Sequence, residues 1–124
     1  MYNLSEEFVE KFPYDKREKY NIALLSFQYM LNNDFMDILT DISQEIGRGG
    51  EKIGFVFPNI CEPDDEDYFE NGVCFYFGDN EQIIEYDEFY NLLKITCDIY
   101  LESHQEDDKL VKKKLVIIKN RYKL

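Results

Sequence analysis

Apolar residues recur at helical spacing through the first third of the chain. Over residues 15–32 the spacing of three and four predicts one helix, with one stripe formed by Tyr20, Ala23, Leu24, Phe27 and Leu31. A shorter helix is expected before it, capped by Ser5 and ended by Pro13. The amino-terminal third is therefore expected to be helical.

A second stripe follows a polar break at residues 32–34, where Asp34 is a plausible N-cap. It predicts a helix over residues 35–46 that turns these side chains inward: Phe35, Ile38, Leu39, Ile42 and Ile46. Three glycines at positions 47, 49 and 50 are expected to end this helix.

Beyond these glycines the pattern changes to short β-rich runs. They predict strands over residues 52–57, 72–77 and 82–86. The turn sequence at residues 78–81, Gly-Asp-Asn-Glu, predicts that the last two strands form an antiparallel hairpin. The acidic connection over residues 59–71 is expected to be an exposed loop, and whether it adds a fourth strand stays open.

Helical spacing returns after Asp87 and Glu88, whose charges suit a helix amino terminus. The stripe is broad and predicts a largely buried helix on the sheet, carrying Phe89, Leu92, Leu93, Thr96, Cys97, Ile99 and Tyr100. After a polar connection at residues 103–108, a last helix is expected over residues 108–122, with Val111, Leu115, Ile118 and Tyr122 on one side. Helices, then strands, then helices predict an α+β fold, a small antiparallel sheet of about three to four strands packed with N-terminal and C-terminal helices.

The length of 124 residues predicts a single domain over residues 1–124. Its net charge is −12, and residues 53–93 contain eleven Asp and Glu but no Lys or Arg. Such a surface repels phosphate backbones and anionic membranes, so we expect no direct binding to nucleic acid or membranes. It attracts basic proteins instead.

Three cysteines, at positions 61, 74 and 97, are an odd number without a CxxC pair, which favours a reducing compartment. The first residues lack the basic and apolar regions of a signal peptide. No apolar run approaches the length of a membrane span. We therefore expect a cytoplasmic protein.

Catalytic signatures are weak. His104 is the only histidine and lies in a polar connection, while Cys74 and Cys97 fall in a strand and on an apolar helix face. A Cys–His nucleophile is therefore not expected, and the glycines at 47–50 lack the pattern of a phosphate-binding loop. We predict no enzyme, no catalytic residues and no cofactor.

The acids do not match an EF-hand loop, because Phe69 stands where the loop starting at Asp64 needs glycine. We therefore expect no dedicated metal site. An alternative stays open, in which the same acids serve a Ca²⁺- or Mg²⁺-binding protein or a small metal-dependent enzyme.

Charge segregation of this degree favours a protein-binding surface over a merely solvated one. Tyrosines, which are favoured interface residues, are interleaved with the acids. The partner-binding residues predicted from this charge argument are Asp64, Asp65, Glu66, Asp67, Tyr68, Glu70, Tyr76, Asp79, Glu81, Glu85 and Tyr86. Their carboxylates would speed encounter with a basic protein, and tyrosines would supply the central packing.

Three segments carry a family resemblance: residues 70–77 (ENGVCFYF), 85–93 (EYDEFYNLL) and 97–101 (CDIYL). Over about residues 68–108 the sequence resembles immunity proteins of bacterial contact-dependent growth inhibition systems, in the group paired with ribonuclease toxins. The resemblance implies a non-enzymatic cytoplasmic inhibitor that binds the C-terminal domain of one cognate toxin, one to one, and blocks its active site. It transfers no residue roles. A basic ribonuclease cleft would complement the acidic surface.

Overall fold

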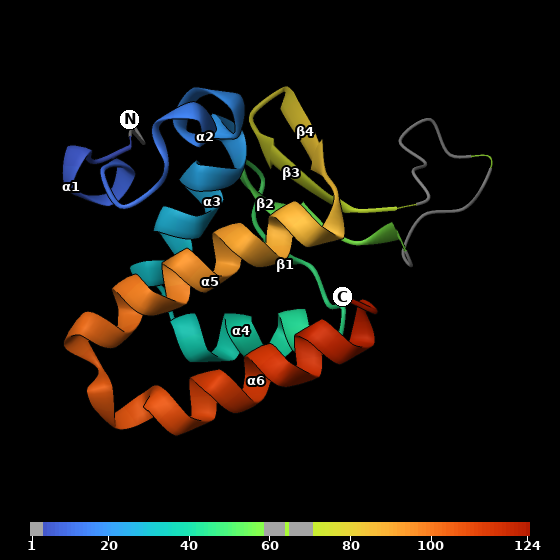
Figure 1. Cartoon of the computed structure of the whole chain (residues 1–124). Coiled ribbons are helices and arrows are strands. Elements are labelled where there is room, and N and C mark those ends of the chain that lie inside the picture. Colours follow the sequence, from blue (N-terminus) through green and yellow to red (C-terminus); the bar gives the residue numbers. More distant parts are fainter. Residues whose placement is uncertain (1–3, 59–63, 65–70) are drawn as a thin grey trace.

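The computed structural model describes residues 4–58, 64 and 71–124 (Figure 1). Helices precede and follow an antiparallel sheet, which confirms the α+β class. The elements in chain order are α1 (Glu6–Val9), α2 (Tyr14–Lys19), α3 (Asn21–Leu31), α4 (Phe35–Ser43), β1 (Arg48–Gly49), β2 (Ile53–Val56), β3 (Val73–Phe77), β4 (Asn80–Ile84), α5 (Tyr86–Ser103), the 3₁₀ helix η2 (Gln105–Asp107) and α6 (Asp108–Arg121).

The sheet has four strands in the order β1-β2-β3-β4. The fourth strand comes from the glycine-rich segment that was expected only to end a helix, because Arg48 pairs with Phe55 and Gly49 with Gly54. The hairpin of β3 and β4 is confirmed, with a shorter turn than predicted, since Phe77 pairs with Asn80. Gly78 holds a φ of 61° in this turn, a conformation that glycine adopts without strain.

The strand predicted over residues 82–86 begins and ends two residues earlier. Glu85 is the N-cap of α5 and Tyr86 is its first residue, so Tyr86 belongs to a helix and not to the sheet. Asp87 and Glu88 lie in the first turn of α5, as predicted. The hairpin therefore leads directly into the long helix.

The single helix predicted over residues 15–32 is two helices, broken at Tyr20, whose φ and ψ are −115° and 31°. The side chain of Gln82 on β4 bridges the break. Its Nε2 donates a hydrogen bond to the Lys19 carbonyl, and its Oε1 accepts one from Ala23 N at 3.4 Å. A residue far along the chain thus satisfies backbone groups at the break, which helical periodicity cannot reveal.

Helix α4 ends at Ser43 and not at Ile46, and Ile46 is 45% exposed instead of facing inward. The helix closes in a Schellman arrangement, with Ile46 N donating to Asp41 O at 2.9 Å and Glu45 N to Ile42 O at 3.1 Å. Glu45 takes the left-handed conformation (φ 56°) that glycine usually supplies. Asp34 is at the N-cap position, but its side chain makes no capping hydrogen bond.

An aromatic cluster joins the helices to the inner face of the sheet. The ring of Phe27 on α3 lies 5.4 Å from that of Phe75 on β3 and 6.0 Å from that of Phe89 on α5. Figure 1 shows α5 between the β3–β4 hairpin and the pair formed by α4 and α6. The core therefore lies on one side of the sheet, which leaves its other side as the candidate surface.

Candidate partner-binding site

The predicted partner-binding residues fall into two groups. Asp64 is exposed, whereas the rest of the acidic connection in the prediction lies outside the described residues: Asp65, Glu66, Asp67, Tyr68 and Glu70. The other predicted residues lie on the hairpin or at the start of α5. The geometry of the candidate site can therefore be described for the hairpin and the start of α5.

Acidic and apolar side chains alternate along the outer side of β4. Glu81, Ile83 and Glu85 are exposed, while Ile84 is buried against the core. Because successive strand residues point to opposite faces, Glu81 and Ile83 share the face away from the aromatic cluster, and Glu85 follows directly at the N-cap of α5. Asp79 adds an exposed acid in the hairpin turn. The hairpin thus presents three carboxylates around one exposed isoleucine.

These hairpin acids have no basic partner in the part of the chain that the structure describes. There, ion pairs join Lys11 to Glu102, Lys16 to Glu88, Arg48 to Asp41, Lys112 to Asp108 and Arg121 to Glu45. Asp79, Glu81 and Glu85 are in none of them. Their negative charge is therefore not compensated by a neighbouring Lys or Arg of the described residues.

Tyr76 on β3 lies opposite Glu81 on β4. The β1–β2 turn holds its side chain in place. Its phenol donates a hydrogen bond to the Gly50 carbonyl at 2.6 Å. A Cβ at Gly54 would come within 2.6 Å of the same phenol oxygen, so the glycine makes room for the tyrosine. Burial, and to a smaller degree Cys74, raise the pKa of Tyr76. This tyrosine is a fixed, half-buried part of the outer face.

Tyr86 lies in a different environment. Its ring stacks on that of Tyr122, with 4.8 Å between centroids and 24° between planes. Burial, followed by Glu45, raises the pKa of its phenol. Tyr86 therefore packs between α5 and α6, and the structure does not group it with Tyr76 in the sheet.

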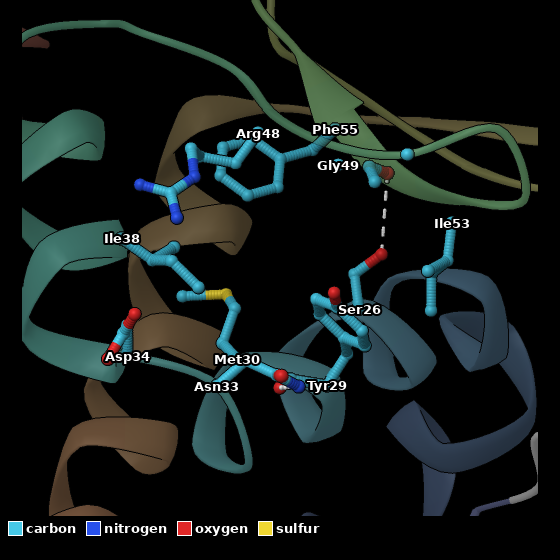
Figure 2. Close-up of a pocket in the computed structure, with 12 residues that line it drawn as sticks. Ser26, Tyr29, Met30, Asn33, Asp34, Ile38, Arg48, Gly49, Ile53 and Phe55 are labelled. Carbon is cyan, nitrogen blue, oxygen red and sulfur yellow. Dashed lines mark hydrogen bonds between the residues drawn. The ribbon is translucent and has the colours of Figure 1, made fainter.

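Two hollows flank the β1–β2 turn. The first, a cavity of about 350 Å³ shown in Figure 2, lies between α3, the start of α4 and this turn. Its walls include buried Met30, Ile38 and Phe55, and Ser26 Oγ donates to the Gly54 carbonyl at 3.3 Å. The lining contains no His or Cys.

The second hollow, of about 620 Å³, opens on the outer side of the sheet. It is lined by Ile46, Val56 and Tyr76 together with the backbone of β1. Charge reasoning missed Ile46, Val56 and Ile83. For Ile83 a signal was available in the sequence, because it lies at an alternate position between two acids, Glu81 and Glu85.

Other candidate chemistry is scattered. His104 stacks on Tyr100 with 4.1 Å between ring centroids, and its Nδ1 lies 3.0 Å from the Tyr100 carbonyl. Burial, with a smaller effect of Asp98, raises the pKa of the Cys97 thiol to about 12, which keeps it protonated and unreactive at neutral pH. Among residues 4–58, 64 and 71–124, no three His, Cys, Asp or Glu form a group able to hold a metal. No helix in these ranges combines the length and apolarity needed to cross a membrane.

A protein-family model described as "CDI immunity protein", where CDI is contact-dependent growth inhibition, matches residues 19–115. The match extends beyond the resemblance at residues 68–108 and includes α3, α4 and the whole sheet. A search of curated proteins found no match. The chain therefore belongs to the family of CDI immunity proteins.

Proposed function

We propose that this protein neutralises one cognate toxin, a basic ribonuclease domain, by covering its active site with the acidic surface of the hairpin and the preceding connection. Membership of the immunity-protein family supports a toxin-neutralising, non-enzymatic role. The observation that carries the acidic mechanism is the set of exposed carboxylates at Asp79, Glu81 and Glu85, which form no ion pair among the described residues. Family membership alone does not specify them.

A ribonuclease must hold the phosphates of its substrate, so its cleft is lined by Lys and Arg. Carboxylates fixed on a hairpin present the same negative charge as the substrate phosphates, but they contain no bond that the ribonuclease can cleave. They also attract the cleft over distances of about a Debye length, roughly 8 Å at physiological salt. The rate of encounter is thereby raised before any short-range contact forms.

The acidic connection is part of the same proposal. Asp64, Asp65, Glu66, Asp67 and Glu70 would extend the negative surface, and Tyr68 would add an aromatic contact. The same charge disfavours direct binding of nucleic acid or an anionic membrane to this surface. The proposed place of action is the cytoplasm, where a cognate toxin would meet RNA.

The test needs the cognate toxin domain, which is to be sought as the C-terminal domain of a large exported protein encoded next to this chain's gene. Light scattering after size exclusion should give a one-to-one complex, and calorimetry should give tight binding. RNA cleavage by that domain should stop at one equivalent of inhibitor. Cleavage that persists at stoichiometric inhibitor would overturn the proposed function. Binding that blocks a different activity, such as DNA cleavage, would retain the immunity role and overturn the ribonuclease assignment.

A further inference from the structure

We propose that the energetic centre of the toxin contact is an apolar strip on the face of the sheet opposite the aromatic cluster, and that its occupant is an apolar projection of the same toxin domain flanked by basic residues. This rests on the proposed function and assigns a central contact that the charge argument does not contain. The strip consists of Val56, Cys74 and Ile83, and is called the outer strip below. Cys74 is 7% exposed, so the accessible part of the strip is Ile83 with half-buried Val56.

The strand register builds the outer strip. Val56 pairs with Cys74, and Cys74 pairs with Ile83, so the three residues form one row across β2, β3 and β4. Ile83 is 53% exposed at the end of this row, between Glu81 on the same strand and Glu85 at the N-cap of α5. Such cross-strand neighbours lie about 4.5–5.5 Å apart at Cβ, which makes the row continuous.

The next row fixes the shape of the surface beside the outer strip. Gly49, Gly54, Tyr76 and Glu81 lie opposite one another across the four strands. The phenol of Tyr76 reaches back to the Gly50 carbonyl on the far side of this row, at 2.6 Å. Its rotamer is therefore set before any partner arrives, which lowers the entropy cost of burying the ring.

A hollow continues the surface beyond the outer strip. Ile46 lines the hollow of about 620 Å³ together with Val56 and Tyr76, and is 45% exposed. A projection that covers Ile83 and Val56 can therefore enter this hollow along the sheet. Contacts that dominate interface energies cluster near the centre in well-packed, desolvated pockets and often include a tyrosine. A projection seated over Ile83 and Val56 and against the ring of Tyr76 would form such a contact.

Charge complementarity identifies the occupant. Glu81 lies on the same side of β4 as Ile83, Glu85 follows at the N-cap of α5, and Asp79 stands in the hairpin turn, and all three acids are exposed. A neutral or acidic partner would bring no counter-charge to these groups, whereas a basic one would pair with them as it desolvates the isoleucine. The occupant is therefore an apolar residue group with Lys or Arg on either side, as expected at the rim of a basic cleft.

The helix α6 offers a useful contrast. It also exposes apolar side chains, Leu110, Val116 and Ile117, but among lysines at positions 109, 112, 113 and 119. A basic partner would be repelled there. Ile117, which is 39% exposed, is therefore a control of the same residue type in the opposite electrostatic setting.

The experiment measures association and dissociation rates of wild type, Ile83→Gln and Ile117→Gln with the cognate toxin domain used to test the proposed function. Ile83→Gln should raise the dissociation rate about tenfold or more, with little change in association rate. Ile117→Gln should match wild type. Ile83→Thr keeps the β-branched side chain and serves as a second variant if Gln weakens the strand, which urea unfolding of the free protein would reveal.

The outcomes separate the two proposals. Wild type that fails to bind the toxin domain overturns the proposed function and this inference with it. Wild type that binds and inhibits, while both Ile83 variants dissociate at its rate, overturns this inference alone. Faster dissociation of Ile117→Gln in place of Ile83→Gln also overturns it, and moves the central contact to α6.

Discussion

The phenol of Tyr122 donates a hydrogen bond to the main-chain carbonyl of Ile42, with 2.6 Å between the two oxygens. It joins the end of α6 to the end of α4 across eighty positions of sequence. The Tyr122 ring also stacks on that of Tyr86, and its centroid lies 6.0 Å from that of Phe57, so one side chain connects the last helix, the long helix and the residue that follows β2.

Removing this hydroxyl should weaken the fold without emptying the core. In Tyr122→Phe the ring contacts persist and the hydrogen bond is lost, which should cost about 1 kcal/mol of unfolding free energy. Urea unfolding measures the change. Tyr14→Phe is the control, because Tyr14 is 85% exposed and should stay within about 0.5 kcal/mol of wild type. Equal effects in the two variants would contradict the prediction.

Gly54 should tolerate no side chain. An added Cβ would lie 2.5 Å from the Arg48 carbonyl oxygen and 2.6 Å from the phenol of Tyr76. Gly54→Ala should therefore lower the unfolding free energy by about 1–3 kcal/mol through overpacking. At Gly50 nothing lies within 4 Å of such a Cβ, so Gly50→Ala should be neutral or slightly stabilising. A Gly54→Ala protein as stable as Gly50→Ala would refute this account of the outer face.

Gln82 should hold together the break between α2 and α3. Gln82→Ala leaves the Lys19 carbonyl and the Ala23 amide without that side chain, at a cost of about 1–3 kcal/mol. Hydrogen exchange should speed up most at the Ala23 amide. Exposed Gln105, replaced by Ala in the same way, should leave this exchange unchanged. Uniformly faster exchange throughout the fold would argue against a local role.

Stability should fall at alkaline pH. The Cys97 thiol has a pKa of about 12 in the folded chain against an ordinary value of 9.0, mainly because of burial. Between these values the unfolded chain has lost its proton and the folded chain keeps it, so this contribution is complete below pH 9 and lost as pH rises toward 12. Burial and Asp107 act in the same direction on Tyr100, whose pKa rises from 10.0 to about 12.

The measurement is urea unfolding from pH 8 to pH 11. The unfolding free energy should decline above pH 9, with a slope of up to about 1.4 kcal/mol per pH unit for one such group. Cys97→Ala should flatten the first part of the decline, near pH 9, where tyrosines of ordinary pKa 10.0 are still mostly protonated. A steep decline that survives in Cys97→Ala would assign the effect to other groups.

Local patterns predicted much of the fold. Ser5 caps α1 by accepting a hydrogen bond from Phe8 N at 3.1 Å, and the alternating run around Phe75 forms the hairpin as expected. The α+β order followed from where the hydrophobic period changes. The misplaced features depend on distant groups: the break at Tyr20 is bridged by Gln82, and β1 exists because Arg48 and Gly49 find partners on β2.

The candidate site was predicted less completely, for a physical reason. Charge composition marks acids such as Glu81 and Glu85, but it does not show which apolar residues share their face. Helical spacing predicted that Ile46 faces the core. The Schellman turn at Glu45 instead ends α4 before Ile46 and leaves this side chain exposed. The outer strip can be recognised only from the strand register, which the pattern of charges does not show.

Charge reversal on the hairpin should act on encounter with the toxin domain. Asp79→Lys with Glu81→Lys should slow association about tenfold at low salt and flatten its salt dependence, because steering by these carboxylates is lost. The fourfold change of Asp64, Asp65, Glu66 and Asp67 to Lys should do the same if the connection shares the contact.

Asp98→Lys with Glu106→Lys makes the same change in net charge as the hairpin double variant, at exposed positions outside the hairpin, and should slow association much less. Dissociation should change little in all three, in contrast to Ile83→Gln. Unchanged association in both the hairpin and the connection variants would place the interface elsewhere, with the lysines at 112–114 of α6 as the next surface to reverse.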